Sequence, residues 1–349
     1  MLPVQRDFRV SLFLALSLQA CKVAAQSDVA RADSASEPVL MIEAYADVYF
    51  AFDMNEPSGF DIPYSVSHNR HNEFNVNLAC ITARYAADRV RGVFTPGFGT
   101  YMNANYAAER ITLQNLVEAN IGVRVFKDKD IWIDAGVLPS PFTNETAFAL
   151  DQPTLTRSLA PEFVPYYLSG ARLTLPLGKR WNLYAYLLNG WQQIQDMNAP
   201  LAAGSWIEFK PNDRLSLHWN NYYGYEGSEA APANRFRTFT DAYAIWSPSE
   251  RWSCTASAYM GWQERSVNDT SSTDSWWQAN ATAKHFLKNG SAFYARAERF
   301  SDPGSVMVTP ITAVSGFQVY SATIGHERGI SDAVKFRLEA RIFQADDKV

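Results

Sequence analysis

Apolar and polar residues alternate with period two over most of the chain. Residues 117–125 read VEANIGVRV, and the two faces of this stretch differ: one carries Ala119, Ile121 and Val123, and the other carries Glu118, Asn120 and Arg124. A strand with one apolar and one charged face places each face in a different environment. The pattern therefore predicts strands that separate lipid from water.

Fifteen such segments follow one another, joined by connections that are alternately short and long. Residues 127–130 and 178–180 form short turns, whereas residues 139–162 form a long loop. This rhythm is typical of a transmembrane β-barrel. We predict an all-β, antiparallel, up-and-down barrel with strands at 41–53, 72–85, 89–98, 112–126, 131–138, 163–176, 181–190, 204–210, 214–225, 235–247, 251–263, 275–287, 291–300, 316–327 and 334–344.

Fifteen strands conflict with the even number that bacterial single-chain barrels have, so we expect about 16. The simplest reading is that the last strand is missing from this chain, which makes the barrel at 41–349 incomplete at its C-terminal end. The alternative is that our assignment divides one strand into two or misses one strand. Open strand edges are not tolerated in lipid.

Composition agrees with a barrel and not with helical membrane spans. Aromatic residues make up 14% and charged residues 19% of the chain, against about 25% charge in soluble domains. Mean hydropathy is −0.22, and the sequence contains no apolar run of about 18 residues.

The N-terminus has the features of a secretory signal peptide at 1–25. Arg6 and Arg9 precede an apolar stretch, and small residues end before Gln26. A lipoprotein site at Cys21 is the alternative, so the sequence leaves open which signal peptidase cleaves the chain. Residues 26–40 are polar and predict a flexible periplasmic segment. These features indicate the outer membrane of a Gram-negative bacterium.

Without residues 1–25 the chain has 28 basic and 35 acidic residues. This net charge, near −7, argues against nucleic acid as a partner. Cys80 and Cys254 then remain, and we predict that both are unpaired and face lipid.

Several segments resemble one known family. They are WIDAGVLPSPF (132–142), TLTRSL (154–159), PYYLSGARLTLPL (165–177) and NLYAYLLNGWQ (182–192). They resemble the OmpL-like β-barrel porins of the porin-2 type from Bacteroidetes outer membranes, over most of residues 40–345. The resemblance implies an outer-membrane pore and no particular substrate. PSPF at 139–142 departs from the longer PSHIG version in the family.

Charged residues on the polar faces are the candidate pore lining. Arg or Lys facing lipid at mid-bilayer costs about 2–4 kcal/mol, so these groups must face the interior. The predicted lining is Glu118, Asn120, Arg124, Asp134, Arg172, Lys284, Arg296, Glu298, Lys335, Arg337, Glu339 and Arg341. A closed lumen plugged by salt bridges is the alternative.

The long loop at 139–162 is a candidate constriction. It carries Glu145, Asp151, Arg157 and Glu162, and opposed charges across a narrowing would impose a transverse field on solutes. An ordinary surface loop is the alternative reading.

Aromatic residues near strand ends, among them Trp132, Trp181 and Trp276, predict interfacial girdles. Inward-facing Tyr45, Tyr49 and Tyr184 suggest a second role, the stacking of carbohydrate.

Two weaker patterns point to chemistry. Ser216, His218 and Asn220 share one strand face, as a hydrolase would require. His68 and His71, with Glu73 or Asp61, have a weak metal-ligand spacing.

We therefore predict a non-enzymatic porin without cofactor or metal, which allows passive diffusion of small hydrophilic solutes or ions. A closed structural or adhesive barrel is the first alternative, and a barrel hydrolase is the second. Expected partners are outer-membrane lipids, the solutes and the barrel-assembly machinery, with a homo-oligomer left open.

Overall fold

The computed structural model describes residues 13–20, 38–198, 200–227, 234–266, 269–312 and 316–346. Its sheet contains sixteen strands. They are β1 (Phe13–Ala20), β2 (Val39–Asp53), β3 (Glu73–Ala86), β4 (Val90–Phe98), β5 (Leu116–Arg124), β6 (Trp132–Pro139), β7 (Tyr167–Leu177), β8 (Trp181–Leu188), β9 (Ala202–Asn212), β10 (Leu215–Glu226), β11 (Arg235–Ser249), β12 (Trp252–Ser266), β13 (Asp269–Phe286), β14 (Ser291–Asp302), β15 (Phe317–Ser331) and β16 (Val334–Ala345).

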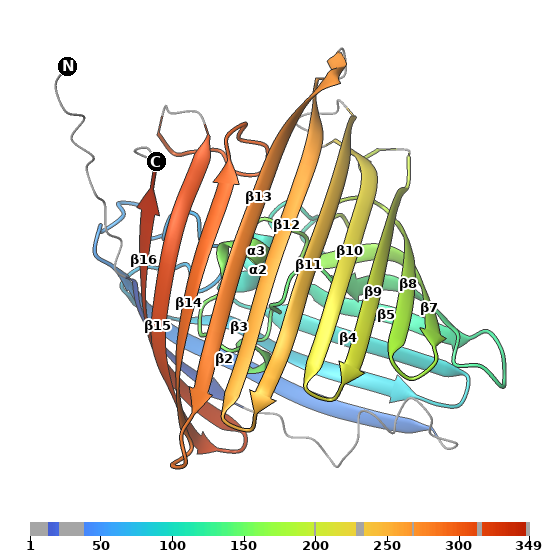
Figure 1. The fold of residues 1–349 in the computed structure, drawn as a ribbon, viewed down its shortest axis with the longest axis horizontal. Helices are drawn as coiled ribbons and strands as arrows, with labels where there is room; N and C mark the ends of the chain where they lie inside the picture. Colours follow the sequence, from blue (N-terminus) through green and yellow to red (C-terminus); the bar gives the residue numbers. More distant parts are fainter. Residues whose placement is uncertain are drawn as a thin grey trace.

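The strands from β2 to β16 form an up-and-down antiparallel meander, as predicted (Figure 1). Each strand pairs with its neighbours in sequence order. The short turns gather at one end of the barrel and the long loops at the other, because the two kinds of connection alternate. None of the helices in the described residues is long and apolar enough to cross a bilayer.

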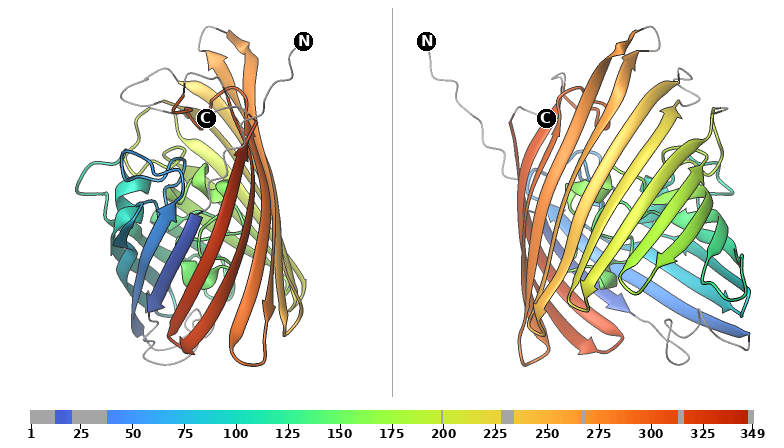
Figure 2. Two further views of the ribbon diagram at one scale, coloured as in Figure 1. Left: turned by 90° about the vertical axis from the view of Figure 1, so that its left-hand side faces the viewer. Right: turned by 45° about the vertical axis from the view of Figure 1, so that its right-hand side comes forward.

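β1 closes the sheet between its two ends. It pairs antiparallel with β2 on one side and with β16 on the other, and Figure 2 shows it between these strands. Its residues lie inside the predicted signal peptide, and cleavage after residue 25 would remove it. The signal peptide and the incomplete C-terminal end both stay predictions. The rest of residues 1–25 and nearly all of 26–40 lie outside the described residues.

The two faces of the wall differ as the alternation predicts. On β14, Phe293 faces outward with 54% exposure, whereas Arg296 and Glu298 point inward and are buried. At the short-turn end Trp181 and Phe209 stack on the outer face with ring centroids 4.1 Å apart. Trp132 and Trp276 were predicted for a girdle, but both are buried on the inner face, so that part of the prediction is wrong.

A bulge changes the facing of β3. The pairing register between β2 and β3 shifts between Asp47 and Val48, where β3 has one extra residue. Side chains of β3 beyond this residue therefore point to the opposite face from the one that strict alternation predicts. Leu78 and Cys80 are consequently buried in the lumen. The prediction that Cys80 faces lipid is wrong, although both it and the half-exposed Cys254 are unpaired.

The interior of the barrel is not empty. The loop between β6 and β7, residues 140–166, bends into it and carries a 3₁₀ turn, η1 (Ala149–Asp151), and a short helix, α3 (Leu159–Glu162). Helix α2 (Thr100–Asn105) lies beside it (Figure 1). We name residues 140–166 the inward loop.

Candidate functional site: the charged lumen

A glycine pair lies on the two strands that flank the inward loop. Gly136 on β6 faces Gly170 on β7, and their φ angles are 129° and 153°. A Cβ atom on either residue would lie within 2.2 Å of a neighbouring backbone oxygen. Residues with a side chain rarely adopt these φ angles, and their Cβ atoms would clash with the neighbouring strands. Only glycine therefore permits the close approach of the strands at these two positions.

Three of the four candidate constriction residues are buried in the lumen. Glu145, Arg157 and Glu162 are 8%, 2% and 9% exposed, whereas Asp151 is exposed and lines a cavity of about 270 Å³ next to β2 and β3. The loop therefore lies inside the barrel and not on its surface.

Inward side chains of β14 and β16 hold the loop backbone. The hydrogen bonds between them include those from Arg296 Nη1 to the Thr156 carbonyl (2.6 Å), from Arg341 Nη1 to the Arg157 carbonyl (3.0 Å), from the Leu155 N–H to Glu339 (2.8 Å) and from the Leu159 N–H to Glu298 (2.6 Å). Arg337 of β16 also donates to the Thr154 carbonyl at 2.7 Å and to the Gln152 carbonyl at 3.1 Å. These charged groups satisfy backbone groups that a buried loop would otherwise leave unpaired.

Arg296 is the centre of this attachment. Its side chain is fully buried and forms ion pairs with Glu298 at 3.2 Å and with Glu145 of the loop at 3.4 Å. It also donates to the Thr154 hydroxyl at 2.9 Å. Burial raises the pKa of the Glu145 carboxyl above its ordinary value, and the neighbouring Arg296 opposes that shift.

Strands on either side of β14 and β16 also hold the loop. Asp241 on β11 accepts a hydrogen bond from the Thr143 N–H at 2.8 Å, and the Ala149 N–H donates to the Tyr45 hydroxyl of β2 at 3.1 Å. The loop consequently crosses the lumen, with contacts to strands that lie far apart in the sheet.

The loop also interlocks with two other long loops. The Arg157 guanidinium lies over the rings of Tyr101 and Tyr166, 4.7 and 4.1 Å from their centroids. Glu162 accepts from the Val66 N–H at 2.7 Å and lies 3.6 Å from Arg157. Burial raises the pKa of Glu162, while Arg157 counters the shift.

A second charged cluster lies on the wall formed by β4, β6 and β7. Asp134 receives Arg91 at 2.8 Å and Arg172 at 3.0 Å. The two arginine side chains are 20% and 18% exposed, so water reaches them. Our sequence analysis missed Arg91, although its place between Val90 and Gly92 in an alternating stretch was the available signal.

The remaining predicted lining residues are distributed over the same surface. Asn120 donates to Glu118 at 2.9 Å on β5, and Arg124 contacts Asp88 at 3.1 Å near the short turns. On β13, β15 and β16 a cluster forms around Glu327, which the sequence analysis also missed: its cations are Lys284 (2.7 Å), Arg337 (2.6 Å) and Lys335 (3.8 Å). Their role as a pore lining stays a prediction.

The family model described as "Putative beta-barrel porin-2, OmpL-like" matches residues 40–349. This match covers most of the chain. The chain belongs to this porin-2 family.

A solved structure of an outer-membrane channel shares the fold of this porin-2 chain, and a porin is among the similar structures. The outer membrane channel DcaP of Acinetobacter baumannii is 11% identical with a TM-score of 0.53, and 97% of each chain is covered. The anion-selective porin of Comamonas acidovorans is 8% identical with a TM-score of 0.49, over 97% of this chain and 100% of that one. A search of curated proteins returned no match.

The porin-2 barrel places Ser216 and His218 in contact, but the histidine ring has the wrong tautomer to act as the base of a hydrolase. The Ser216 hydroxyl lies 2.6 Å from His218 Nε2, and Trp206 donates its indole N–H to His218 Nδ1 at 3.1 Å. Because Nδ1 accepts, a neutral ring carries its proton on Nε2, which then cannot accept the serine proton. Asn220 binds Asp241 instead, at 2.9 Å.

The weak metal pattern is not assembled either. His68 Nε2 lies 2.8 Å from Asp47, while His71 Nδ1 accepts from the Asp53 N–H at 3.0 Å. Within the described residues, no group of three or more potential ligands could hold a metal ion.

The inner-face aromatics also differ from the carbohydrate platform that we considered. Tyr184 and Trp206 stack with centroids 4.0 Å apart, and His218 stacks on Tyr243 at 4.2 Å. Each of these rings is covered on one face by its partner, which leaves less flat surface for a sugar.

Proposed function

We propose that this protein is an outer-membrane porin through which small hydrophilic solutes or ions diffuse passively. The observation that carries the proposal is the combination of a transmembrane barrel with an inner wall of charged residues and a loop held across the lumen. Membership of the porin-2 family supports it. Such a lumen selects by charge and width and needs no chemical step.

The two ends of the barrel follow from the connections. In bacterial barrels the short turns lie on the periplasmic side and the long loops outside. The short-turn end is therefore the periplasmic mouth in this proposal. A signal peptide at 1–25 and insertion by the barrel-assembly machinery complete the expected route, and the proposal leaves association into a homo-oligomer open.

The candidate constriction in this proposal is the inward loop. Its buried charges are bound to wall residues directly, so solutes pass beside the loop and not between it and β14. Selectivity would then depend on partly exposed charges such as Arg91 and Arg172.

A closed barrel with external loops as a binding surface is the second candidate, and the dense network around Arg296 favours it. Single-channel conductance of the refolded protein in planar bilayers separates the two. Discrete ohmic steps establish an open lumen. Folded protein that never conducts overturns the porin proposal and supports the closed barrel.

A further inference from the structure

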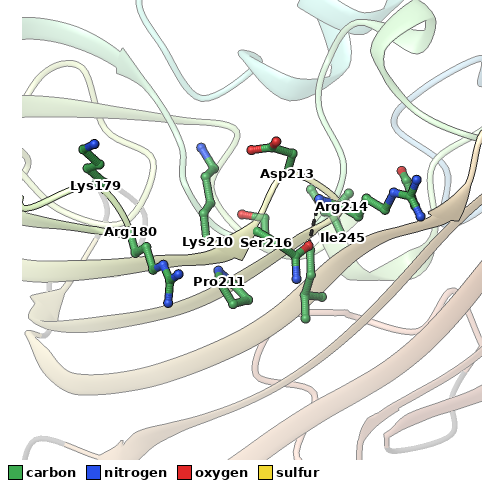
Figure 3. A pocket seen from close by; sticks show the side chains of 11 residues that line it. Lys179, Arg180, Lys210, Pro211, Asp213, Arg214, Ser216 and Ile245 are labelled. Atoms are coloured by element: carbon green, nitrogen blue, oxygen red, sulfur yellow. Dashed lines mark hydrogen bonds between the residues drawn. The ribbon is translucent and has the colours of Figure 1, made fainter.

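The periplasmic mouth contains a pocket with a concentration of positive charge. The pocket has a volume of about 560 Å³. Its basic residues come from the β7–β8 turn, from β9 and from the β9–β10 turn (Figure 3). They are Lys179, Arg180, Lys210 and Arg214, and we name them the basic rim.

Lys210 of the basic rim faces the lumen and not the lipid. The Lys210 N–H donates to the Arg180 carbonyl at 2.8 Å, which places these residues opposite each other on neighbouring strands. The next pair along the strands, Trp181 and Phe209, stacks on the outer face. Because successive side chains alternate between faces, Lys210 points to the inside. Figure 3 shows Lys179 and Lys210 extending to the same side, and Arg180 extending away from them.

Positive charge on the basic rim exceeds the negative charge near it. Lys210 forms an ion pair with Glu208 at 2.7 Å, and Asp213 is the acidic residue that lines the pocket. Within the described part of the chain, Lys179 and Arg180 form no ion pair. Like charges repel each other, and an anion bound between Lys179 and Lys210, which extend to the same side, would relieve their repulsion.

We propose that the basic rim binds the carboxylate or phosphate groups of small anionic solutes at the periplasmic mouth. The ammonium groups of Lys179 and Lys210, which extend to the same side of the pocket, form charge-assisted hydrogen bonds with these groups. The pocket volume is in the range of small-ligand sites. This inference rests on the proposed porin function, because the solute reaches the pocket through or from the lumen.

Direct binding tests the inference without requiring conduction. Citrate, and separately inorganic phosphate, is titrated calorimetrically into the full-length protein, folded in detergent at low salt. The variant Lys179→Gln/Lys210→Gln is expected to weaken citrate binding about tenfold, because two charge-assisted contacts are lost. Equal citrate affinity in the variant and the original chain overturns the proposal, as does the absence of citrate and phosphate binding.

The matched control is Lys127→Gln/Lys129→Gln. It removes the same charge from another connection at the same end, between β5 and β6, outside the pocket. Unchanged citrate affinity in this control supports the rim as the site. An equal loss in both double variants shows an effect of overall charge and overturns the assignment.

Two further measurements separate the remaining interpretations. Titration with dihexanoylphosphatidylglycerol tests a lipid headgroup as the source of phosphate. If that lipid binds while citrate and phosphate do not, the solute proposal is overturned. A protein that conducts ions without binding citrate retains the porin function but not this site. A protein that binds citrate without conducting loses the porin function but retains the anion site.

Discussion

The attachment of the inward loop to β14 predicts a specific effect of Arg296→Met. The substitution keeps an apolar side chain of similar length but removes the guanidinium that holds Glu145 and two threonines of the loop. Glu145 would keep its contacts with Ser158 but lose its buried cation. Removing one partner of a buried ion pair costs about 3–5 kcal/mol.

That cost falls mainly on the position of the loop. The backbone ladder of the wall does not involve the Arg296 side chain, so the barrel itself should persist. A cost of about 3 kcal/mol shifts the equilibrium between the inward and a displaced loop more than about 100-fold toward displacement. We expect a larger single-channel conductance and faster trypsin cleavage after Arg157, which is 2% exposed in the attached loop.

Arg299→Met is the matched control on the same strand. Arg299 pairs with Asp346 at 2.6 Å in a partly exposed position, where an ion pair contributes about 0–1 kcal/mol. Its substitution should leave both readouts unchanged. If Arg296→Met also leaves conductance and trypsin resistance unchanged while the barrel remains folded, the loop is not held by this network and our reasoning is wrong.

Three other predictions concern the wall and the loop. Ala281→Arg, at an exposed outward position of β13, should lower the yield of heat-modifiable barrel in lipid vesicles by an amount that corresponds to about 2–4 kcal/mol; Ala281→Leu should not, and equal yields would contradict the outward assignment. Burial raises the pKa values of Glu145 and Glu162, so the attached loop binds protons more tightly than a displaced one. Loop attachment should therefore strengthen as pH falls toward the ordinary carboxyl pKa and weaken as pH rises through the raised values, which bilayer recordings would detect as lower conductance at acid pH; higher conductance there would refute the argument. Gly170→Ala should destabilise the barrel by about 1–3 kcal/mol in a urea titration, because φ is 153° there. Gly204→Ala should cost less, because its added Cβ would lie 3.3 Å from the Asn221 carbonyl oxygen, a tight contact that a small shift relieves.

The facing of the wall residues was predictable because the strand period is fixed by backbone geometry. Once Ala295 and Ala297 are assigned to lipid, Arg296 and Glu298 have to point inward. The same rule fails at Leu78 and Cys80, since the bulge next to Asp47 adds one residue to the strand. Nothing in the local composition marks that bulge, so a strict alternation assigned Cys80 to the wrong face.

The contacts of the inward loop were beyond sequence reasoning. The charges of Glu145 and Arg157 suggested a loop in the lumen, but the partners depend on how the sheet closes. Glu145 meets Arg296, which lies 151 residues away along the chain. Such a pair follows only from the three-dimensional course of the barrel, so we predicted a transverse field where the structure has direct ion pairs.

The arrangement of the loop divides the lumen into two unlike halves. Arg296, Glu298 and Arg341 are buried beneath the loop and bind it. Their charges are neutralised by these contacts and exert little electrostatic force on a passing solute. Arg172 lies on β7, on the other side of the lumen, and remains partly exposed. β7 leads into the turn that carries Lys179 and Arg180 at the periplasmic mouth. Cations that water can reach therefore lie on this wall between mid-barrel and the basic rim, and the partly exposed Lys335 of β16 is a further one. If solutes pass beside the loop as we propose, they meet these cations although the chain has more acidic than basic residues.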